Sequence, residues 1–261
     1  MIKSAYFPNQ TFETKEALFN ELKTYKDKLI NLKRATILNS DSLKNVQLKR
    51  LDAIKGVDLD DEYTYHVINT TKYLDSHGDV HTDSIWTKSV KEQQGKVYFV
   101  ADHDLSIKSV IAYPEDVEMY VDAIEWKNIG VDLDGTTNAL IFKVKKTDIQ
   151  LDSALDIITN KRSIEHSVRM QYVKIDLAIN DSTDDFKAEK GVWDSTIDTI
   201  ANKEVAVEQG YFWRVSEAKI SQEGSMVLKG SNDATPILQQ KVEKEVEIIE
   251  EVKTFIPTFI I

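Results

Sequence analysis

The segment 167–179 constrains the fold of this chain most, because its apolar side chains recur at every second position, which is the period of a β-strand. The earlier apolar residues share one parity and the later ones share the other: Val168, Met170 and Tyr172, then Val173, Ile175, Leu177 and Ile179. The change of parity at Tyr172–Val173 predicts a β-bulge. The chain is therefore expected to contain a β-sheet with this strand in it.

Other β-rich runs between Tyr63 and about Pro236 predict further strands at residues 65–70, 96–101, 139–145 and 211–215. Two helices interrupt this region, one beginning near Pro114 and one ending near Gly210. Their apolar residues are Val117, Tyr120, Val121 and Ile124 in the first, and Ile197, Ile200, Ala201 and Val205 in the second. Strands and helices do not alternate as in βαβ units, so we expect an α+β fold that is mainly antiparallel β with peripheral helices.

Both ends of the chain differ from this region. Apolar spacings of four and three predict a helix from Thr14, its N-cap, to about Lys33, and a second helix is predicted from residue 40 or 41 to 51. From residue 239 the chain is charged, with a heptad-like spacing typical of a coiled-coil arm, and residues 255–261 are apolar. The division is therefore an N-terminal helical arm (1–60), a core (61–237) and a charged C-terminal arm with an apolar tail (238–261). A first helix that packs on its own domain is an equally good interpretation.

The composition restricts the partners and the compartment. The chain has 261 residues, of which 41% are hydrophobic, and no run as long as the ~20 apolar residues of a membrane span. A formal net charge of −11 argues against nucleic acid as a partner. The chain has no cysteine, which excludes disulfides, and its first residues lack the apolar core of a signal peptide. An intracellular protein without a membrane partner is the simplest interpretation.

Ser167, at the start of the long strand, is the candidate nucleophile. A serine hydroxyl becomes nucleophilic when a base accepts its proton and a third group orients that base. The adjacent His166 is a poor base, because neighbouring residues of a strand point to opposite faces. His103 is a better one, because it follows a predicted strand and such positions often carry function. The remaining histidines are His66, His77 and His81.

Two carboxylates compete for the role of the third group. Glu223 opens the run 224–228, which is predicted to begin a strand, and Glu217 lies in a nearby stretch. Neither is distinguished by the residues around it alone.

A metal site is a minor hypothesis. His77 and His81 stand four residues apart, a spacing that brings two rings to one zinc ion only on a helix. Gly78–Asp79 between them predicts a turn instead. We therefore expect neither a metal nor a cofactor, and a metal-dependent hydrolase is kept only as a third possibility.

Four segments, in this order along the chain, resemble motifs of the prohead (capsid maturation) protease family of tailed phages, which is related to the herpesvirus assembly proteases. They are Asp75-Ser76-His77-Gly78-Asp79-Val80, Ala101-Asp102-His103-Asp104, Glu165-His166-Ser167-Val168 and Glu223-Gly224-Ser225-Met226-Val227, the last followed by Gly230-Ser231-Asn232. The resemblance covers residues 63–236.

This resemblance implies a closed antiparallel β-barrel of the herpesvirus-protease type with helical arms. It implies a serine endopeptidase in which Ser167 attacks the peptide carbonyl, His103 transfers the proton and Glu223 orients the imidazole. It further implies that the enzyme works in the host cytoplasm, inside the assembling prohead, as a homo-oligomer. Its substrates would be the scaffold protein, the N-terminal segment of the major capsid protein and finally the protease itself.

The residues after Ser167 depart from the family pattern. The family usually has a small, glycine-containing stretch where this chain has Val168-Arg169-Met170. This departure and the two arms motivate an alternative, a non-catalytic capsid-assembly or scaffold protein that keeps the protease fold. Whether Ser167 reacts as a nucleophile separates the two hypotheses.

Overall fold

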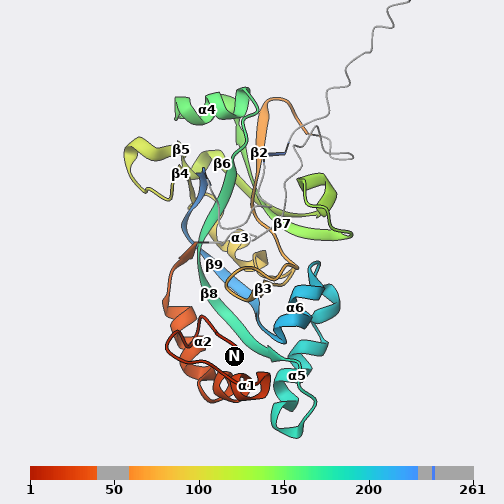
Figure 1. Cartoon of the computed structure of the whole chain (residues 1–261). Coiled ribbons are helices and arrows are strands. Elements are labelled where there is room, and N and C mark those ends of the chain that lie inside the picture. Colours follow the sequence, from red (N-terminus) through yellow and green to blue (C-terminus); the bar gives the residue numbers. More distant parts are fainter. Residues whose placement is uncertain (40–58, 229–236, 239–261) are drawn as a thin grey trace, which may run out of the picture.

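The computed structural model describes residues 1–39, 59–228 and 237–238 (Figure 1). Its helices are α1 (Lys15–Thr24), α2 (Lys26–Ala35), α3 (Thr87–Gln93), α4 (Asp152–Thr159), α5 (Lys187–Asp194) and α6 (Lys203–Gln209). Its strands are β1 (Leu38–Asn39), β2 (Tyr63–Asn69), β3 (Asp79–His81), β4 (Tyr98–Ala101), β5 (Val110–Ala112), β6 (Val117–Glu125), β7 (Thr136–Lys145), β8 (Glu165–Ile179), β9 (Tyr211–Val227) and β10 (Ile237–Leu238).

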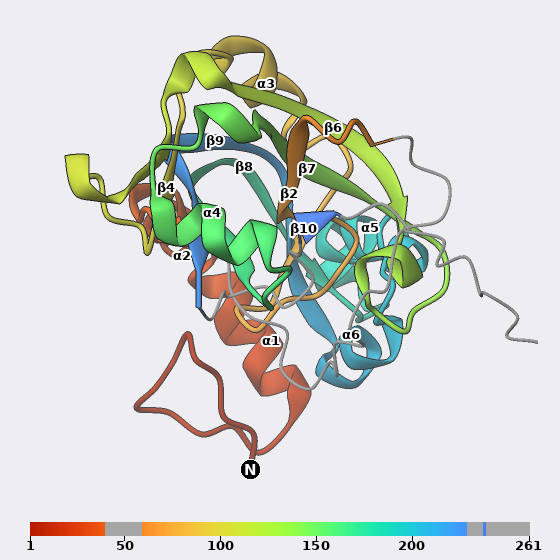
Figure 2. The same ribbon diagram turned by 90° about the horizontal axis from the view of Figure 1, so that it is seen from above.

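The strands form two open sheets with helices around them (Figures 1 and 2). The larger sheet has the order β1-β8-β9-β4-β5, with β3 also paired to β9, and the smaller sheet has the order β10-β2-β7-β6. β3 and β4 run parallel to β9. The fold is therefore mixed α+β.

The prediction of a closed antiparallel β-barrel is wrong. A barrel closes only when the first and last strands of a sheet hydrogen-bond to each other. Within the described residues, β1 and β5 instead form opposite edges of the larger sheet, and β10 and β6 form opposite edges of the smaller one. The parallel pairing of β4 with β9 also breaks the antiparallel alternation that was expected.

β8 and β9 are the longest strands, with 15 and 17 residues, and they form the centre of the larger sheet. Tyr172 pairs with Ala218 and Lys174 pairs with Glu217, so Val173 is an extra residue on β8. The bulge predicted at Tyr172–Val173 is thus confirmed. It turns Val173 outward, to 39% exposure, and leaves the apolar residues before and after it buried.

The prediction of a helix after Pro114 is wrong. A single 3-10 turn, Pro114–Asp116, precedes strand β6, which pairs with β7 along its whole length. The apolar residues suited a helical stripe, but three of the four are β-branched and favour the pleated surface that β7 offers. These are Val117, Val121 and Ile124.

The helix predicted from Thr14 and the helix predicted to end near Gly210 are present with altered limits. Thr14 is the N-cap of α1, as predicted, because its side chain accepts a hydrogen bond from Ala17 N at 3.1 Å. The region predicted as a single helix forms two helices, because the helical backbone is interrupted at Tyr25, between α1 and α2. Gly210 ends α6 in the left-handed conformation, with φ 81°. The helix predicted at 40–51 and the arm predicted from 239 lie outside the described residues.

The two sheets pack face to face. The rings of Phe99 on β4 and Phe142 on β7 lie 6.0 Å apart between centroids. A Cβ atom on Gly224 of β9 would lie 2.5 Å from the Phe142 ring, so this position requires glycine. The face of the larger sheet that carries Phe99 and Gly224 is its inner face. Glu223 and Ser225, which alternate with Gly224, therefore point to the opposite, outer face.

The N-terminal helices pack against the larger sheet. Figure 1 shows α1 and α2 beside the lower end of β8. Leu18, Phe19 and Leu22 of α1 are buried and belong to the same hydrophobic cluster as residues of β8 and β9. Residues 38–39 then add a short edge strand to β8. The first 39 residues thus contribute to the core of the fold.

Candidate active site

His103 and Glu223 form the central pair of the candidate site. The Nδ1 atom of His103 lies 2.7 Å from Oε1 of Glu223, which is hydrogen-bond distance. Glu223 is fully buried, whereas the His103 side chain is 17% exposed. A carboxylate at Nδ1 favours the tautomer that carries its proton there and leaves Nε2 as a base. In the part of the chain that the structure describes, Nε2 has no hydrogen-bond partner.

The parallel register of β4 and β9 brings this pair together. Tyr98 is level with Glu223 and Ala101 is level with Met226, so β4 ends beyond the carboxylate. The chain then turns back, because Asp102 and His103 both adopt left-handed backbone conformations, with φ 51° and 55°. This turn brings the imidazole back along the outer face to Glu223.

β9 is also distorted next to Glu223. Val168 pairs with Gly224 and Met170 pairs with Ile220, so three residues of β9 stand opposite one residue of β8. Gln222, in the middle of this bulge, has φ 71°. Bulges of this kind redirect side chains and occur frequently beside active sites.

Left-handed backbone is concentrated around the pair. Asp102, His103 and Gln222 are three of the five non-glycine residues with positive φ among the described ranges. Each such residue costs about 1–3 kcal/mol and persists only where its surroundings hold it. The folded protein therefore stores backbone strain where the His103–Glu223 bond forms.

Ser167 lies on the strand next to Glu223. Ser167 of β8 pairs directly with Ser225 of β9, and residues opposite each other in a sheet point to the same face. The structure thus places Ser167, Glu223 and His103 on, or just after, the adjacent strands β8, β9 and β4. Ser167 is buried, with 1% exposure.

Glu217 is placed elsewhere. Its carboxylate forms ion pairs with Lys174 at 2.8 Å and Lys88 at 3.1 Å. Hydrogen bonds from these two lysines hold the pKa of Glu217 below its usual value. Of the two carboxylates that the sequence left open, Glu223 is therefore the one that meets His103.

His166 points away from Ser167, as the strand geometry predicts. Its Nε2 atom lies 2.9 Å from Nδ1 of His66 on β2, in the other sheet. The Nε2 atom of His66 lies 3.1 Å from the Thr64 hydroxyl, and both rings are fully buried. Burial lowers the pKa of His66 well below its usual value, so this imidazole is neutral. This link between the sheets was not foreseen from the sequence.

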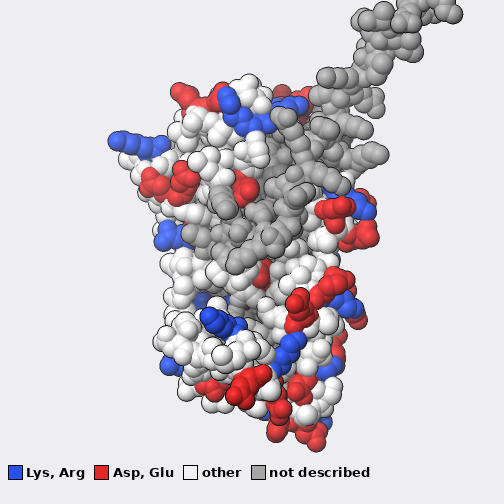
Figure 3. Space-filling view, in the orientation of Figure 1, with Lys and Arg blue, Asp and Glu red and all other residues white. Residues whose placement is uncertain are grey.

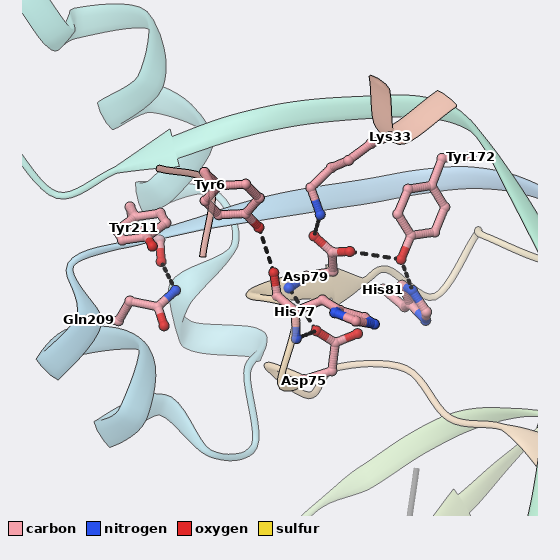
Figure 4. Close-up of polar contacts among 9 residues, drawn as sticks. All are labelled: Tyr6, Lys33, Asp75, His77, Asp79, His81, Tyr172, Gln209 and Tyr211. Atoms are coloured by element: carbon pink, nitrogen blue, oxygen red, sulfur yellow. Dashed lines mark hydrogen bonds and ion pairs between the residues drawn. The ribbon is translucent and has the colours of Figure 1, made fainter. Parts of the chain in front are cut away.

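A second polar cluster joins α2 to the turn before β3 (Figure 4). The Asp75 carboxylate accepts hydrogen bonds from the backbone N–H groups of His77 and Asp79, at 2.9 and 2.8 Å. Asp79 forms an ion pair with Lys33 of α2 at 2.6 Å. Burial and the neighbouring charge of Asp79 raise the pKa of Asp75 to about 7.

Hydrogen bonding continues from Asp79 into the core. The Tyr172 hydroxyl donates to Asp79 Oδ2 at 2.9 Å and lies 3.1 Å from Nε2 of His81. Asn69 Oδ1 accepts from Trp86 Nε1 at 3.0 Å and lies 3.2 Å from Nδ1 of His81, so the His81 proton belongs on Nδ1. Burial lowers the pKa of His81 to about 4, so its Nε2 is an acceptor. Two acceptors therefore compete for the single proton of the Tyr172 hydroxyl.

This cluster does not support the metal hypothesis. No helix joins His77 and His81: His77 lies in a turn closed by a hydrogen bond from Gly78 N–H to Asp75 O at 3.1 Å, and His81 lies on strand β3 after it. Both ring nitrogens of His81 are within hydrogen-bond distance of side chains of the protein. Across residues 1–39, 59–228 and 237–238, no group of three or more His, Asp or Glu side chains is arranged to hold a metal ion.

Ser225 is a residue of the site that the sequence reasoning did not assign. Its hydroxyl accepts a hydrogen bond from His103 N at 2.9 Å. The available signal was its place two residues after Glu223, because alternate residues of a strand share a face. No feature of the sequence indicated the left-handed conformations of Asp102 and Gln222, because glycine is the residue that normally marks such positions and neither residue is a glycine.

The surface and the comparisons add little to this site. Acidic and basic side chains are interspersed on the face shown in Figure 3. None of the described helices is long and apolar enough to cross a membrane. Comparisons with models of protein families, with curated proteins and with solved structures gave no match.

Proposed function

We propose that this protein is a serine endopeptidase in which Ser167 is the nucleophile, His103 the general base and Glu223 the group that orients the imidazole. Ser167 Oγ attacks the carbonyl carbon of the scissile peptide bond while His103 Nε2 accepts the hydroxyl proton. His103 then returns that proton to the leaving amine. Water hydrolyses the acyl-enzyme by the same route, and Glu223 stabilises the imidazolium formed in each step.

The hydrogen bond between His103 and Glu223 is the observation that carries this proposal. It joins a partly exposed imidazole to a buried carboxylate across 2.7 Å, which is the arrangement that orients a general base. The pair is held by strained backbone on both sides, and Ser167 lies on the adjoining strand, facing the same way as Glu223.

The order of the four motifs supports a narrower proposal. On that reading the enzyme is a phage capsid maturation protease that acts in the host cytoplasm, inside the prohead, as a homo-oligomer. Its substrates are the scaffold protein and the N-terminal segment of the major capsid protein, and it cleaves itself. The closed barrel implied by the same resemblance is not part of this proposal.

Covalent labelling tests the nucleophile. The full chain is incubated with a biotinylated fluorophosphonate, the labelled serine is mapped by mass spectrometry, and cleavage of the chain itself and of casein is followed on gels. We expect a label on Ser167 and no cleavage by Ser167→Ala. Ser216→Ala, a change of the same kind on β9 but away from the site, is the control and should behave as the original chain. Unchanged cleavage by Ser167→Ala would exclude Ser167 as the nucleophile.

The burial of Ser167 favours a second candidate, a non-catalytic capsid-assembly or scaffold protein. At 1% exposure the hydroxyl is reached by a peptide only after some rearrangement. This candidate predicts neither fluorophosphonate labelling nor cleavage of casein by the folded chain. Co-expression with the capsid protein would then still increase the yield of assembled shells, and Ser167→Ala would leave that yield unchanged.

A further inference from the structure

Ser225 connects the two halves of the candidate site. It is fully buried on the outer face of β9, two residues after Glu223 and directly opposite Ser167. Its hydroxyl accepts the backbone N–H of His103 at 2.9 Å. A single side chain therefore lies between the proposed base, the proposed nucleophile and the carboxylate that orients the base.

The left-handed turn at residues 102–103 is attached to β9 by two successive backbone amides. Asp102 N–H donates to the carbonyl oxygen of Met226 at 3.0 Å, and His103 N–H donates to the Ser225 hydroxyl. A single left-handed non-glycine residue costs about 1–2 kcal/mol, so two in succession need such an anchor. The second of these amides depends entirely on the Ser225 side chain.

The Ser225 hydroxyl is oriented for this task. Its own proton has two main-chain acceptors within reach, the carbonyl oxygens of Val100 at 3.2 Å and Met226 at 3.3 Å. Donation to either leaves a lone pair directed at His103 N–H. The Ser225 hydroxyl therefore acts as both donor and acceptor within the turn and strand that it joins.

His103 is thus fixed at two points of one strand. Its backbone is bound to Ser225 and its ring to Glu223, at 2.9 and 2.7 Å. Together these bonds define the direction in which Nε2 faces, whereas without the Ser225 bond the backbone of the turn is held to β9 only through Asp102 N–H. Catalytic groups that lose their alignment by about 1 Å lose roughly 10²-fold in rate.

We propose that Ser225 is a positioning residue that holds the Asp102–His103 turn so that the imidazole meets Glu223. This inference rests on the proposed peptidase function for its consequence in catalysis, but the structural part of it is independent of activity. Removal of the Ser225 oxygen leaves the partly buried His103 N–H without its acceptor. The turn then shifts and the ring loses its fixed distance from Glu223.

The test uses the full chain with 15N-labelled histidine and four variants. Ser225→Ala removes the acceptor, and Ser225→Cys keeps the volume but offers only a weak one. Ser225→Thr restores the hydroxyl, and Ser216→Ala is a matched serine-to-alanine control on the same strand, away from the site. The measurements are amide hydrogen exchange at His103, the pH titration of the His103 ring by NMR, and kcat and KM where cleavage occurs.

We expect faster exchange of the His103 amide and a shifted His103 titration in Ser225→Ala and Ser225→Cys, with Ser225→Thr and Ser216→Ala like the original chain. The value of kcat should fall about 10- to 100-fold while KM stays within about twofold. If Ser225→Ala does not fold, Ser225→Cys provides the same comparison. Unchanged exchange and titration in the folded variants would overturn the inference. Absence of cleavage by the original chain, with these NMR changes present, would count against the peptidase function alone.

Discussion

Lys33 Nζ lies 2.6 Å from Asp79 Oδ1, and this ion pair joins helix α2 to strand β3 inside the protein. Asp79 is completely buried and the Lys33 side chain is 12% exposed. The other oxygen of Asp79 accepts a hydrogen bond from Tyr172, so the carboxylate is bonded on both sides. The N-terminal helices are thereby linked electrostatically to the sheet that carries the candidate site.

Lys33→Met should destabilise the protein strongly. The change leaves the buried Asp79 charge without its cation, and breaking a buried pair in this way costs about 3 kcal/mol. Urea denaturation at pH 7 measures the free energy of unfolding. Lys28→Met, an exposed lysine on the same helix, is the control and should change it by less than about 0.5 kcal/mol. Equal effects of the two substitutions would show that the Asp79 pair is not important.

Asp75 should make the protein less stable as pH rises from about 4 to about 7. Burial and the charge of Asp79 raise the pKa of Asp75 from 3.8 to about 7. In this window the folded state keeps a proton that the unfolded state has released, so the free energy of unfolding falls with increasing pH. Asp75→Asn, which keeps the acceptor oxygen, removes this dependence.

The comparison is made between the original chain and Asp75→Asn at pH 5 and pH 8. His81, whose pKa burial lowers to about 4, has the opposite effect on stability, but it is present in both proteins and cancels in the difference. The original chain should lose more stability between the two pH values than the variant does. Parallel curves would mean that Asp75 does not titrate in this range.

Gly224→Ala should destabilise the contact between the sheets. The added Cβ lies 2.5 Å from the Phe142 ring, and overpacking of this kind costs about 1–3 kcal/mol. Phe142→Leu in the same chain should recover part of that loss, as measured in a double-mutant cycle. Gly191→Ala in α5, where a Cβ meets nothing within 4 Å, is the control and should be neutral or stabilising.

Glu223→Gln should reduce cleavage far more than it reduces stability. The amide keeps the size of the side chain but favours the wrong tautomer of His103, a change that costs up to about 10⁴-fold in kcat where such a group orients a catalytic histidine. Glu217→Gln changes an equivalent residue of the same strand that pairs with lysines, so its kcat should stay near that of the original chain. Similar losses in both variants would remove the special role given to Glu223.

Local patterns predicted local structure well. The parity change at Tyr172–Val173 identified a bulge in β8, and Thr14 and Gly210 marked the ends of helices, because each signal depends on a few neighbouring residues. The apolar residues after Pro114 were predicted to form a helix because their spacing fits one, but pairing with β7 makes this segment a strand. The helical spacing was overridden there by a contact with a distant segment, whereas the β-branched residues favoured the strand.

The pairing of strands that are distant along the chain could not be predicted from local patterns in the sequence. The open sheets and the parallel entry of β4 beside β9 depend on which strands meet, and no single stretch of sequence specifies that. The meeting of His103 with Glu223 was expected only from the order of motifs in a resemblance, and the structure supplies its geometry. The His66–His166 contact between the sheets had no sequence signal, since neither histidine indicates its partner.

The separation of His103 and Glu223 by 120 residues has a consequence during synthesis. The histidine leaves the ribosome long before the carboxylate that orients it has been translated, so a growing chain has no assembled site. Any hydrolytic activity would begin only after β9, the strand that carries Glu223, has inserted beside β4. If the proposed peptidase activity is present, this order of synthesis would protect nascent polypeptides, including the chain's own.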